Sequence, residues 1–338
     1  MPATSFQALT FDDILTTTLN EHRPNMVDNL YRASATLNGV TKGGVKKVLD
    51  GGARIIQPVL VTAPSGFSSY GGTDTFTTTI NQRTDAAQYE WAQIGGTIGI
   101  TGTQEILNAG KHARIRMVKA AIEIGEKEIR DQVNTMLLGD GTGNAAKDML
   151  GLNAIISKAA LTVGGLSETT YTAWAPQRTY ATTNVTGFGA SQTSATGGYY
   201  AMQDTWSLCT DGTDSPDLLI SAREPFLSYM IVIGQNTRYI ISGDDNKLFA
   251  GWYGSLFNGA PIVVERNALM GTYADDNATI FFANTNYLDL WVHQDRNFIV
   301  EPWQKPINQD ARYAKLLFAG QLTVSNRRMQ GVMEVNGV

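Results

Sequence analysis

Charged residues are scarce in this sequence. Asp, Glu, Lys and Arg make up 17% of its 338 residues, whereas about 25% is usual for a soluble domain. The hydrophobic content of 43% still indicates a folded protein with a core, and the length allows about two domains. Because so little charge is available to cover the surface, we expect part of that surface to contact something other than water.

Cysteine, excess positive charge and long apolar runs are also lacking. The one cysteine, Cys209, excludes an internal disulfide framework and is expected to be buried and unreactive in a helix. The net charge of −5 argues against a protein that binds nucleic acid over its whole surface. No apolar run approaches the roughly 18 residues of a membrane helix. The first residues lack a secretory signal, so we expect the protein to stay in the cell that makes it.

Patterns of catalysis and metal binding are absent from the sequence as well. The three histidines are scattered without metal-ligand spacing, and we interpret them as ordinary surface or interface residues: His22, His112 and His293. The stretch 139–144 (GDGTGN) follows a helical pattern and is interpreted as a helix end and turn, not a phosphate loop. The acidic stretches 211–217 and 243–247 read as turns. We therefore expect no enzymatic activity, cofactor or metal site.

What the sequence does contain begins with an arm and a long hairpin. Residues 1–50 hold two short amphipathic pieces, which dock either on their own domain or on a neighbouring chain. Residues 53–98 are rich in strand patterns, at 54–62, 73–82 and 87–101, with the glycine-rich stretch 65–79 as a tip. Because a two-stranded hairpin is marginal in water by itself, we expect it to lie on another surface.

The clearest element is a helix over residues 111–138. Apolar residues recur every three or four positions along it: Ile115, Val118, Ile122, Ile129, Val133 and Met136. Gly125 interrupts this stripe, which predicts close packing or a bend there. Residues 141–296 then mix patterns of strands (151–157, 217–222, 260–265, 278–292) and helices (198–211, 223–236). The stretch 169–203, with Arg178 as its sole charge, is interpreted as a long surface loop or insertion.

The order of these pieces resembles the major capsid proteins of tailed bacteriophages with the HK97 fold. The resemblance is carried in sequence order by stretches 14–30, 51–61, 87–93, 100–110, 137–157, 217–230 and 258–265. It implies an α+β capsid fold with an N-terminal arm (1–50), an extended β-hairpin E-loop (51–98), a P-domain containing the long spine helix (99–140 and 297–338) and an A-domain of mixed sheet and helices (141–296).

The resemblance also implies a function and partners. Such subunits form hexamers and pentamers of an icosahedral shell around double-stranded DNA, assembled in the host bacterial cytoplasm with a portal, decoration proteins and a scaffolding protein. We expect a separate scaffolding protein, because the arm leaves no room for a scaffold domain. The hairpin would contact a neighbouring subunit through aromatic side chains: Phe67, Tyr70, Phe76, Tyr89 and Trp91. Since no lysine lies between Lys47 and Lys111, a covalent weld from the E-loop is not expected.

Two groups of basic residues bear on DNA. They are interpreted either as a solvated face or as weak, salt-sensitive phosphate contacts: Lys42, Lys46, Lys47, Arg114, Arg116 and Lys119. Two further readings of the whole chain stay open. An encapsulin-like compartment has the same fold and would hold protein cargo, and an unrelated two-domain enzyme is disfavoured by the missing catalytic set.

Overall fold

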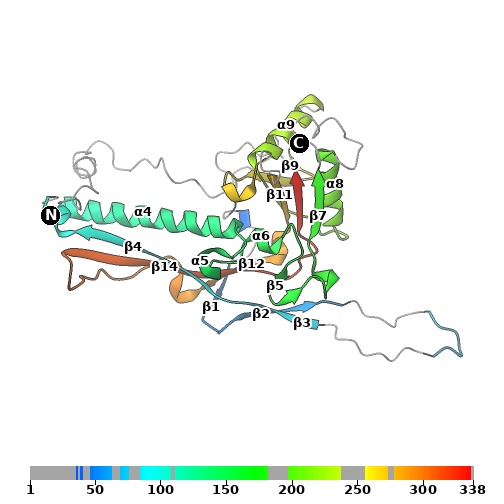
Figure 1. Cartoon of the computed structure of the whole chain (residues 1–338), viewed down its shortest axis with the longest axis horizontal. Helices are drawn as coiled ribbons and strands as arrows, with labels where there is room; N and C mark the ends of the chain where they lie inside the picture. Colours follow the sequence, from blue (N-terminus) through cyan, green and yellow to red (C-terminus); the bar gives the residue numbers. More distant parts are fainter. Residues whose placement is uncertain are drawn as a thin grey trace.

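The described residues fold into an α+β structure with two large sheets and two small two-stranded ones. The computed structural model describes residues 36, 39–40, 46–62, 69–75, 84–107, 111–181, 197–236, 256–272 and 278–335. Most of the predicted N-terminal arm therefore lies outside the described residues. Within them, a long helix with a sheet of long strands forms one end of the molecule, and a lobe with α8 and α9 forms the other (Figure 1).

The first sheet has five strands and is built around β14. Its order is β1 (Lys46–Leu49), β12 (Leu288–His293), β14 (Ala311–Val324) and β13 (Ile299–Val300), and β4 (Ala92–Thr101) also pairs with β14. The β4–β14 pairing is antiparallel over ten residues, from Ala92 opposite Gly320 to Thr101 opposite Ala311. Helix α4 lies along these two strands (Figure 1).

Helix α4 spans Lys111–Leu138, which confirms the predicted helix. Ile129, Val133 and Leu137 repeat every four residues and are buried, so this stripe faces the core. Gly125 lies against Ile98 of β4. A Cβ atom at this position would come within 2.7 Å of Ile98 Cδ1, so close packing explains the glycine.

The second sheet has six strands of mixed direction. Its order is β7 (Gln177–Ala181), β15 (Gly331–Val335), β11 (Ala278–Ala283), β8 (Leu218–Ser221), β10 (Ala260–Val264) and β9 (Leu256–Phe257). All six residues of β11 are buried, as expected for a central strand covered on both faces. The predicted helices are present as α8 (Gly198–Leu208), which packs on β7 and β15, and α9 (Arg223–Asn236), which packs on β11.

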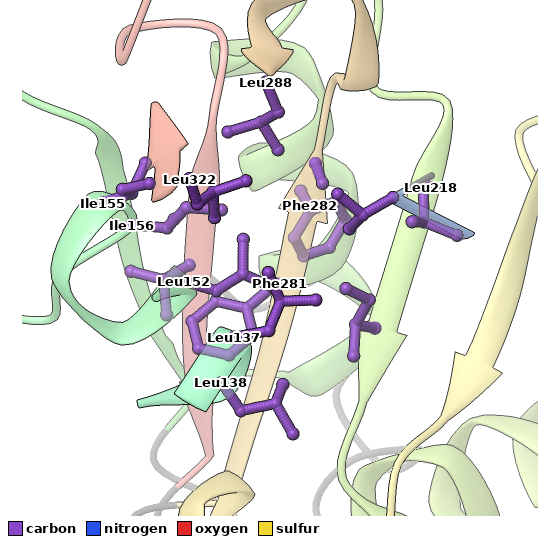
Figure 2. Close-up of a cluster of buried hydrophobic side chains, with 14 of the residues drawn as sticks. Leu137, Leu138, Leu152, Ile155, Ile156, Leu218, Phe281, Phe282, Leu288 and Leu322 are labelled. Carbon is purple, nitrogen blue, oxygen red and sulfur yellow. The ribbon is translucent and has the colours of Figure 1, made fainter. Parts of the chain in front are cut away.

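One core joins the two sheets. The end of α4, α6 (Leu152–Ile155) and strands from both sheets meet there (Figure 2). Its fully buried side chains include Leu137, Leu152, Phe281 and Leu322. Burial of this kind stabilises by about 1.5–3 kcal/mol per large apolar side chain, so the core fixes the long helix against the second lobe.

Near its C-terminus the chain crosses between the two large sheets. After β11 in the second sheet it enters the first sheet for β12, β13 and β14, and it returns to the second sheet for β15. Strand β12 precedes residue 297 and pairs with β14 in the first sheet. Strand β15 follows residue 297 and pairs with β7 and β11 in the second. The sheets therefore do not divide at the predicted boundary between residues 296 and 297.

Two local predictions are wrong. Residues 151–157 were expected to form a strand, but Leu152–Ile155 form α6, because a short apolar run fits a buried helical turn as well as a strand. The stretch 169–203 was expected to be a surface loop, yet its described parts include β7 and the start of α8. Trp174 in the same stretch is only 2% exposed. Residues 182–196 lie outside the described residues.

The remaining elements are short. They are α3 (Gly102–Leu107), α5 (Gly143–Ala146), β5 (Thr162–Val163), β6 (Leu166–Ser167) and the 3-10 helices η1 (Thr172–Trp174), η3 (Ala268–Met270), η4 (Thr285–Tyr287) and η5 (Gln294–Arg296).

Candidate interaction surfaces

A two-stranded hairpin extends from the body of the molecule. Strands β2 (Ile55–Leu60) and β3 (Thr84–Tyr89) pair antiparallel along their full lengths, which confirms that the chain turns back on itself in this region. The returning strand lies later in the sequence than the predicted 73–82, most of which is outside the described residues. The segment 69–75 lies at the far end of the extension (Figure 1).

The inner face of the hairpin belongs to the core. Ile55, Val59 and Ala87 are buried. Tyr89 is 2% exposed, and its hydroxyl donates a hydrogen bond of 3.1 Å to the carbonyl of Val324. Burial of this side chain raises its pKa to about 12. The base of the hairpin is therefore fixed to the C-terminal end of β14 in the first sheet.

The outer face of the hairpin, defined here as Ile56, Pro58 and Leu60, points to solvent. Ile56 and Leu60 are each 63% exposed, and Pro58 is also exposed. These residues alternate with the buried ones, because successive side chains of a strand point to opposite faces. Proline lacks an N–H group, so Pro58 also weakens this strand as a template for adding another strand. None of the described residues covers this apolar row.

Contacts at both ends hold the hairpin in shape. Near the base, the Tyr171 hydroxyl donates to Asp85 Oδ2 at 3.1 Å, and this contact raises the pKa of Tyr171. Near the tip, the Gly71 amide donates to Asp74 Oδ2 at 2.6 Å, and the Asp74 amide donates to the Gly71 carbonyl at 3.0 Å. The outer face of β2 thus lies on a strand pair whose base is bonded to the body of the molecule.

The aromatic residues predicted to contact a neighbour have different positions. Tyr70 is 67% exposed near the tip, whereas Phe67 and Phe76 lie outside the described residues. Trp91 is half-buried; its indole N–H donates to the Gly52 carbonyl at 3.0 Å, and its ring meets His293 edge-on at 5.7 Å. The prediction that Tyr89 contacts a neighbour is corrected. Its side chain is buried within its own chain, so it cannot reach a neighbour in this conformation.

Sequence reasoning missed Ile56 and Leu60 as contact candidates. The sequence contained a signal, because residues 55–60 (IIQPVL) have apolar side chains at both odd-numbered and even-numbered positions. Only one face of a hairpin strand can pack on its own core, so the apolar side chains of the other face are left exposed.

Among the basic residues, Lys47 is the one whose side chain is described. Its Nζ lies 2.7 Å from Asp289 Oδ2 and 5.2 Å from the centre of the Trp291 ring. Its charge is therefore paired within the chain, while 40% of its side chain stays exposed, and its role as a DNA contact stays a prediction. Lys46 lies in β1, and Arg114, Arg116 and Lys119 lie in α4, but their side chains are outside the described part; Lys42 is outside it altogether.

A buried cluster of charges ties the end of α6, the residue that follows β6 and strand β7 to the segment between β14 and β15. Arg327 is fully buried, and its Nη2 lies 2.8 Å from Glu168 Oε1. Arg178 donates to the other oxygen of Glu168 at 2.7 Å and to the Ser157 carbonyl at 2.7 Å. Burial lowers the pKa of Arg327, and the nearby Glu168 opposes this effect. Arg178, the isolated charge of the stretch 169–203, is thus a structural residue.

The stretches interpreted as turns are structural where they are described. In 139–144, the Thr142 amide donates to Asp140 Oδ1 at 3.0 Å, which lowers the pKa of Asp140. Gly141 has a φ of +80°, a conformation that favours glycine. In 211–217, Asp214 accepts a hydrogen bond of 2.7 Å from the Tyr287 hydroxyl. The stretch 243–247 lies outside the described residues.

Cys209 and the histidines offer little chemistry. Cys209 is buried at the end of α8, and burial raises its pKa to about 12, which confirms the expected unreactive thiol. His293 Nδ1 accepts a hydrogen bond from the Asp295 amide; His22 and the side chain of His112 are not described. Within the described residues, no three His, Cys, Asp or Glu side chains gather closely enough to hold a metal ion. None of the described helices combines the length and hydropathy that crossing a membrane requires.

Comparisons with known proteins give matches at the level of structure. No protein-family model matches the sequence, and no curated protein matches it. The solved capsid of Myoviridae phage XM1 superposes with a TM-score of 0.60 at 10% identity, covering 94% of this chain and 97% of that one. The capsid protein of cyanophage A-1(L) gives a TM-score of 0.61 at 13% identity, covering 94% and 96%.

An encapsulin matches over a similar extent. The encapsulin from Synechococcus elongatus superposes with a TM-score of 0.56 at 8% identity, covering 98% of both chains. The chain therefore has the HK97-type fold of phage major capsid proteins, which encapsulin shares. At these identities the likeness establishes the fold, and it agrees with the resemblance found in the sequence.

Proposed function

We propose that this chain is the structural subunit of a closed protein shell. The observation that carries the proposal is the outer face of the hairpin, where Ile56 and Leu60 are each 63% exposed on an ordered extension. An apolar row of this kind is suited to burial against another subunit. The whole-chain likeness to shell proteins supports a second copy of this chain as that subunit.

Within this function we favour a phage capsid that encloses double-stranded DNA. Phage capsids are more numerous than encapsulin among the structural matches. In this proposal the chain forms hexamers and pentamers, with residues 51–98 as the E-loop, 99–140 and 297–338 as the P-domain, and 141–296 as the A-domain. The scaffolding, portal and decoration partners stay predictions of the family resemblance. The second candidate is an encapsulin-like compartment, favoured by the match to encapsulin over 98% of both chains.

Assembly of the purified chain tests the proposal. We expect closed particles by electron microscopy, and we expect the double variant Ile56→Asp, Leu60→Asp to stay as folded subunits because charges on the outer face oppose burial. The matched control is Leu161→Asp, Leu208→Asp, which places the same charges at two exposed leucines outside the hairpin. A wild-type chain that stays monomeric at high concentration, and that also forms no particle in cells that supply the expected scaffolding protein, would overturn the proposal.

The contents of particles separate the two candidates. Particles isolated from cells that carry the native gene should contain double-stranded DNA if the shell is a phage capsid. Particles that contain a discrete protein and no DNA would favour the encapsulin-like compartment instead. Absorbance spectra and nuclease digestion of opened particles make this distinction directly.

A further inference from the structure

The turn between β9 and β10 consists of Asn258 and Gly259. Their φ angles are 48° and 92°, both positive, and the flanking residues Phe257 and Ala260 pair with each other, as in the two-residue hairpin turns that Asn-Gly favours. Both turn residues are exposed. A Cβ atom added at position 259 would meet nothing within 4 Å, so the backbone of the turn is open to its surroundings.

An Asn-Gly pair can react with itself. The backbone nitrogen of the glycine attacks the side-chain carbonyl carbon, Cγ, of the asparagine. A bond from that nitrogen to Cγ forms, the bond from Cγ to Nδ2 breaks, and ammonia leaves with the proton that the glycine nitrogen loses. Water then opens the resulting succinimide ring to give aspartate or isoaspartate. Glycine favours the attack because it has no Cβ to hinder its nitrogen and few limits on backbone rotation.

A residue of α8 holds the amide of Asn258. Asn258 Nδ2 donates to Gln203 Oε1 at 2.9 Å, and Gln203 Nε2 donates to Asn258 Oδ1 at 3.4 Å. The attack requires Cγ of Asn258 to turn towards the nitrogen of Gly259, so this pair of hydrogen bonds must open first. Opening of an exposed contact is a local event that does not require the whole chain to unfold.

We propose that Asn258 is a site of spontaneous deamidation and that its pairing with Gln203 sets the rate. The proposal concerns the covalent chemistry of a single chain and does not rest on the proposed shell function. Asn38 and Asn336 also precede glycines, but both lie outside the described residues. Within the described part of the chain, Asn258 and Gly259 are the one pair of this kind.

The reaction reaches the core through Phe257, the residue before Asn258. Phe257 is 2% exposed. Its ring meets four others edge-on, with centroids 5.7–6.4 Å apart, from Tyr199, Trp206, Tyr229 and Phe282. A carboxylate at position 258 cannot donate to Gln203 Oε1, and isoaspartate adds a carbon to the backbone of a two-residue turn. Deamidation therefore loosens β9 and the contacts of Phe257 with α8.

Ageing of the full chain tests the proposal. Folded wild type and Gln203→Ala are held as dissociated subunits in mildly alkaline buffer, and peptide mass spectrometry measures conversion at each Asn-Gly pair separately. We expect conversion at Asn258 in the folded wild type and conversion about fivefold or more faster in Gln203→Ala, since the hydrogen bonds that oppose the attack are lost. Gln203→Glu keeps the acceptor for Asn258 Nδ2 and should stay closer to the wild-type rate.

Denatured protein supplies the matched control. Wild type and Gln203→Ala should convert at Asn258 at equal rates in denaturant, where the pair does not exist. If the folded wild type shows no conversion at Asn258 while the denatured chain converts completely, the modification site is overturned. Equal rates for the two folded proteins would overturn the role of Gln203. Neither measurement involves particle assembly, so these failures leave the shell function standing.

The variant Asn258→Asp reproduces one product of the reaction. It should unfold about 2 °C or more below the wild type, because its carboxylate cannot donate to Gln203 Oε1. In the Gln203→Ala background the same substitution should have a smaller effect, since the partner is already missing. An equally large effect in that background would contradict loss of this pair as the cause.

Discussion

At the residue scale, the carboxylate of Glu168 forms ion pairs with two arginine side chains in the interior. Arg327 and Arg178 both contact it at less than 3 Å, and Arg327 is fully buried. A buried charge that loses its partner is costly, because water cannot replace the lost interaction. The segments around α6, β7 and the β14–β15 link consequently depend on one side chain.

We therefore expect Glu168→Gln to lower the free energy of unfolding by about 3–5 kcal/mol. The control is Glu90→Gln, which removes an exposed partner of Arg54 at 3.0 Å and should change stability by less than about 1 kcal/mol. Urea unfolding of dissociated subunits measures both. Equal losses for the two variants would contradict a structural role for the buried cluster.

Tyr89 makes stability depend on alkaline pH. Its folded pKa is raised to about 12 from a usual value of 10, so the folded state retains the phenol proton more strongly than the unfolded state does. The corresponding stability is complete below pH 10 and is lost as the pH rises from 10 to 12. Two pH units correspond to a loss on the order of 2 kcal/mol.

The variant Tyr89→Phe should therefore lose stability less steeply between pH 10 and 12 than the wild type does. At pH 7 it should be less stable by about 1 kcal/mol, because the hydrogen bond to Val324 is missing. Tyr180→Phe is the control, since Tyr180 is 53% exposed. Unfolding curves taken across this pH range would refute the assignment if the slopes of wild type and Tyr89→Phe coincide.

At the scale of elements, α4 and β4 fit together at Gly125. A Cβ at position 125 would lie 2.7 Å from Ile98 Cδ1 and 2.9 Å from its Cγ1, closer than van der Waals contact allows. The helix therefore approaches the strand because the side chain is absent there, although glycine costs about 1 kcal/mol of helix propensity.

Gly125→Val should lower the free energy of unfolding by about 1–3 kcal/mol, the usual cost of overpacking. Combining it with Ile98→Ala should recover part of this loss, because the clashing atoms are then removed. Thermal or urea unfolding of the single and double variants measures the coupling between the two sites. If the effects of the two substitutions simply add, the close approach does not limit this packing.

At the scale of the whole molecule, the composition bears on how a shell would be held together. Residues 51–98, the proposed E-loop, contain no lysine, so a bond from a lysine amine to a neighbouring side chain cannot form there. In the proposed shell, subunits would then associate through buried apolar surface and hydrogen bonds, for which the outer face of the hairpin is a candidate.

We expect assembled particles to run as single chains on a denaturing gel after boiling without oxidation. Particles treated with a chemical cross-linker provide a positive control for a covalent product on the same gel. A ladder of wild-type oligomers that survives denaturation would contradict a shell held by non-covalent contacts.

Periodicity in the sequence was enough to predict several elements. The repeat of apolar residues over 111–138 and the pattern over 223–236 correspond to α4 and α9 at the predicted bounds, because a long amphipathic period is a local property. A hairpin within residues 53–98 was also predicted, although its returning strand, β3, lies later in the sequence than the predicted 73–82. By contrast, the four residues of α6 are too few for a period to distinguish helix from strand.

The sequence by itself determined the long helix, the hairpin, the scarcity of charge and the absence of lysine from residues 51–98, since these depend on neighbouring residues or on composition. Only the tertiary structure decided that Tyr89 faces inward while Ile56 and Leu60 face outward. The tertiary structure also decided that β12 pairs in the first sheet and β15 in the second. Such choices depend on strands distant in the sequence, which a local pattern does not contain.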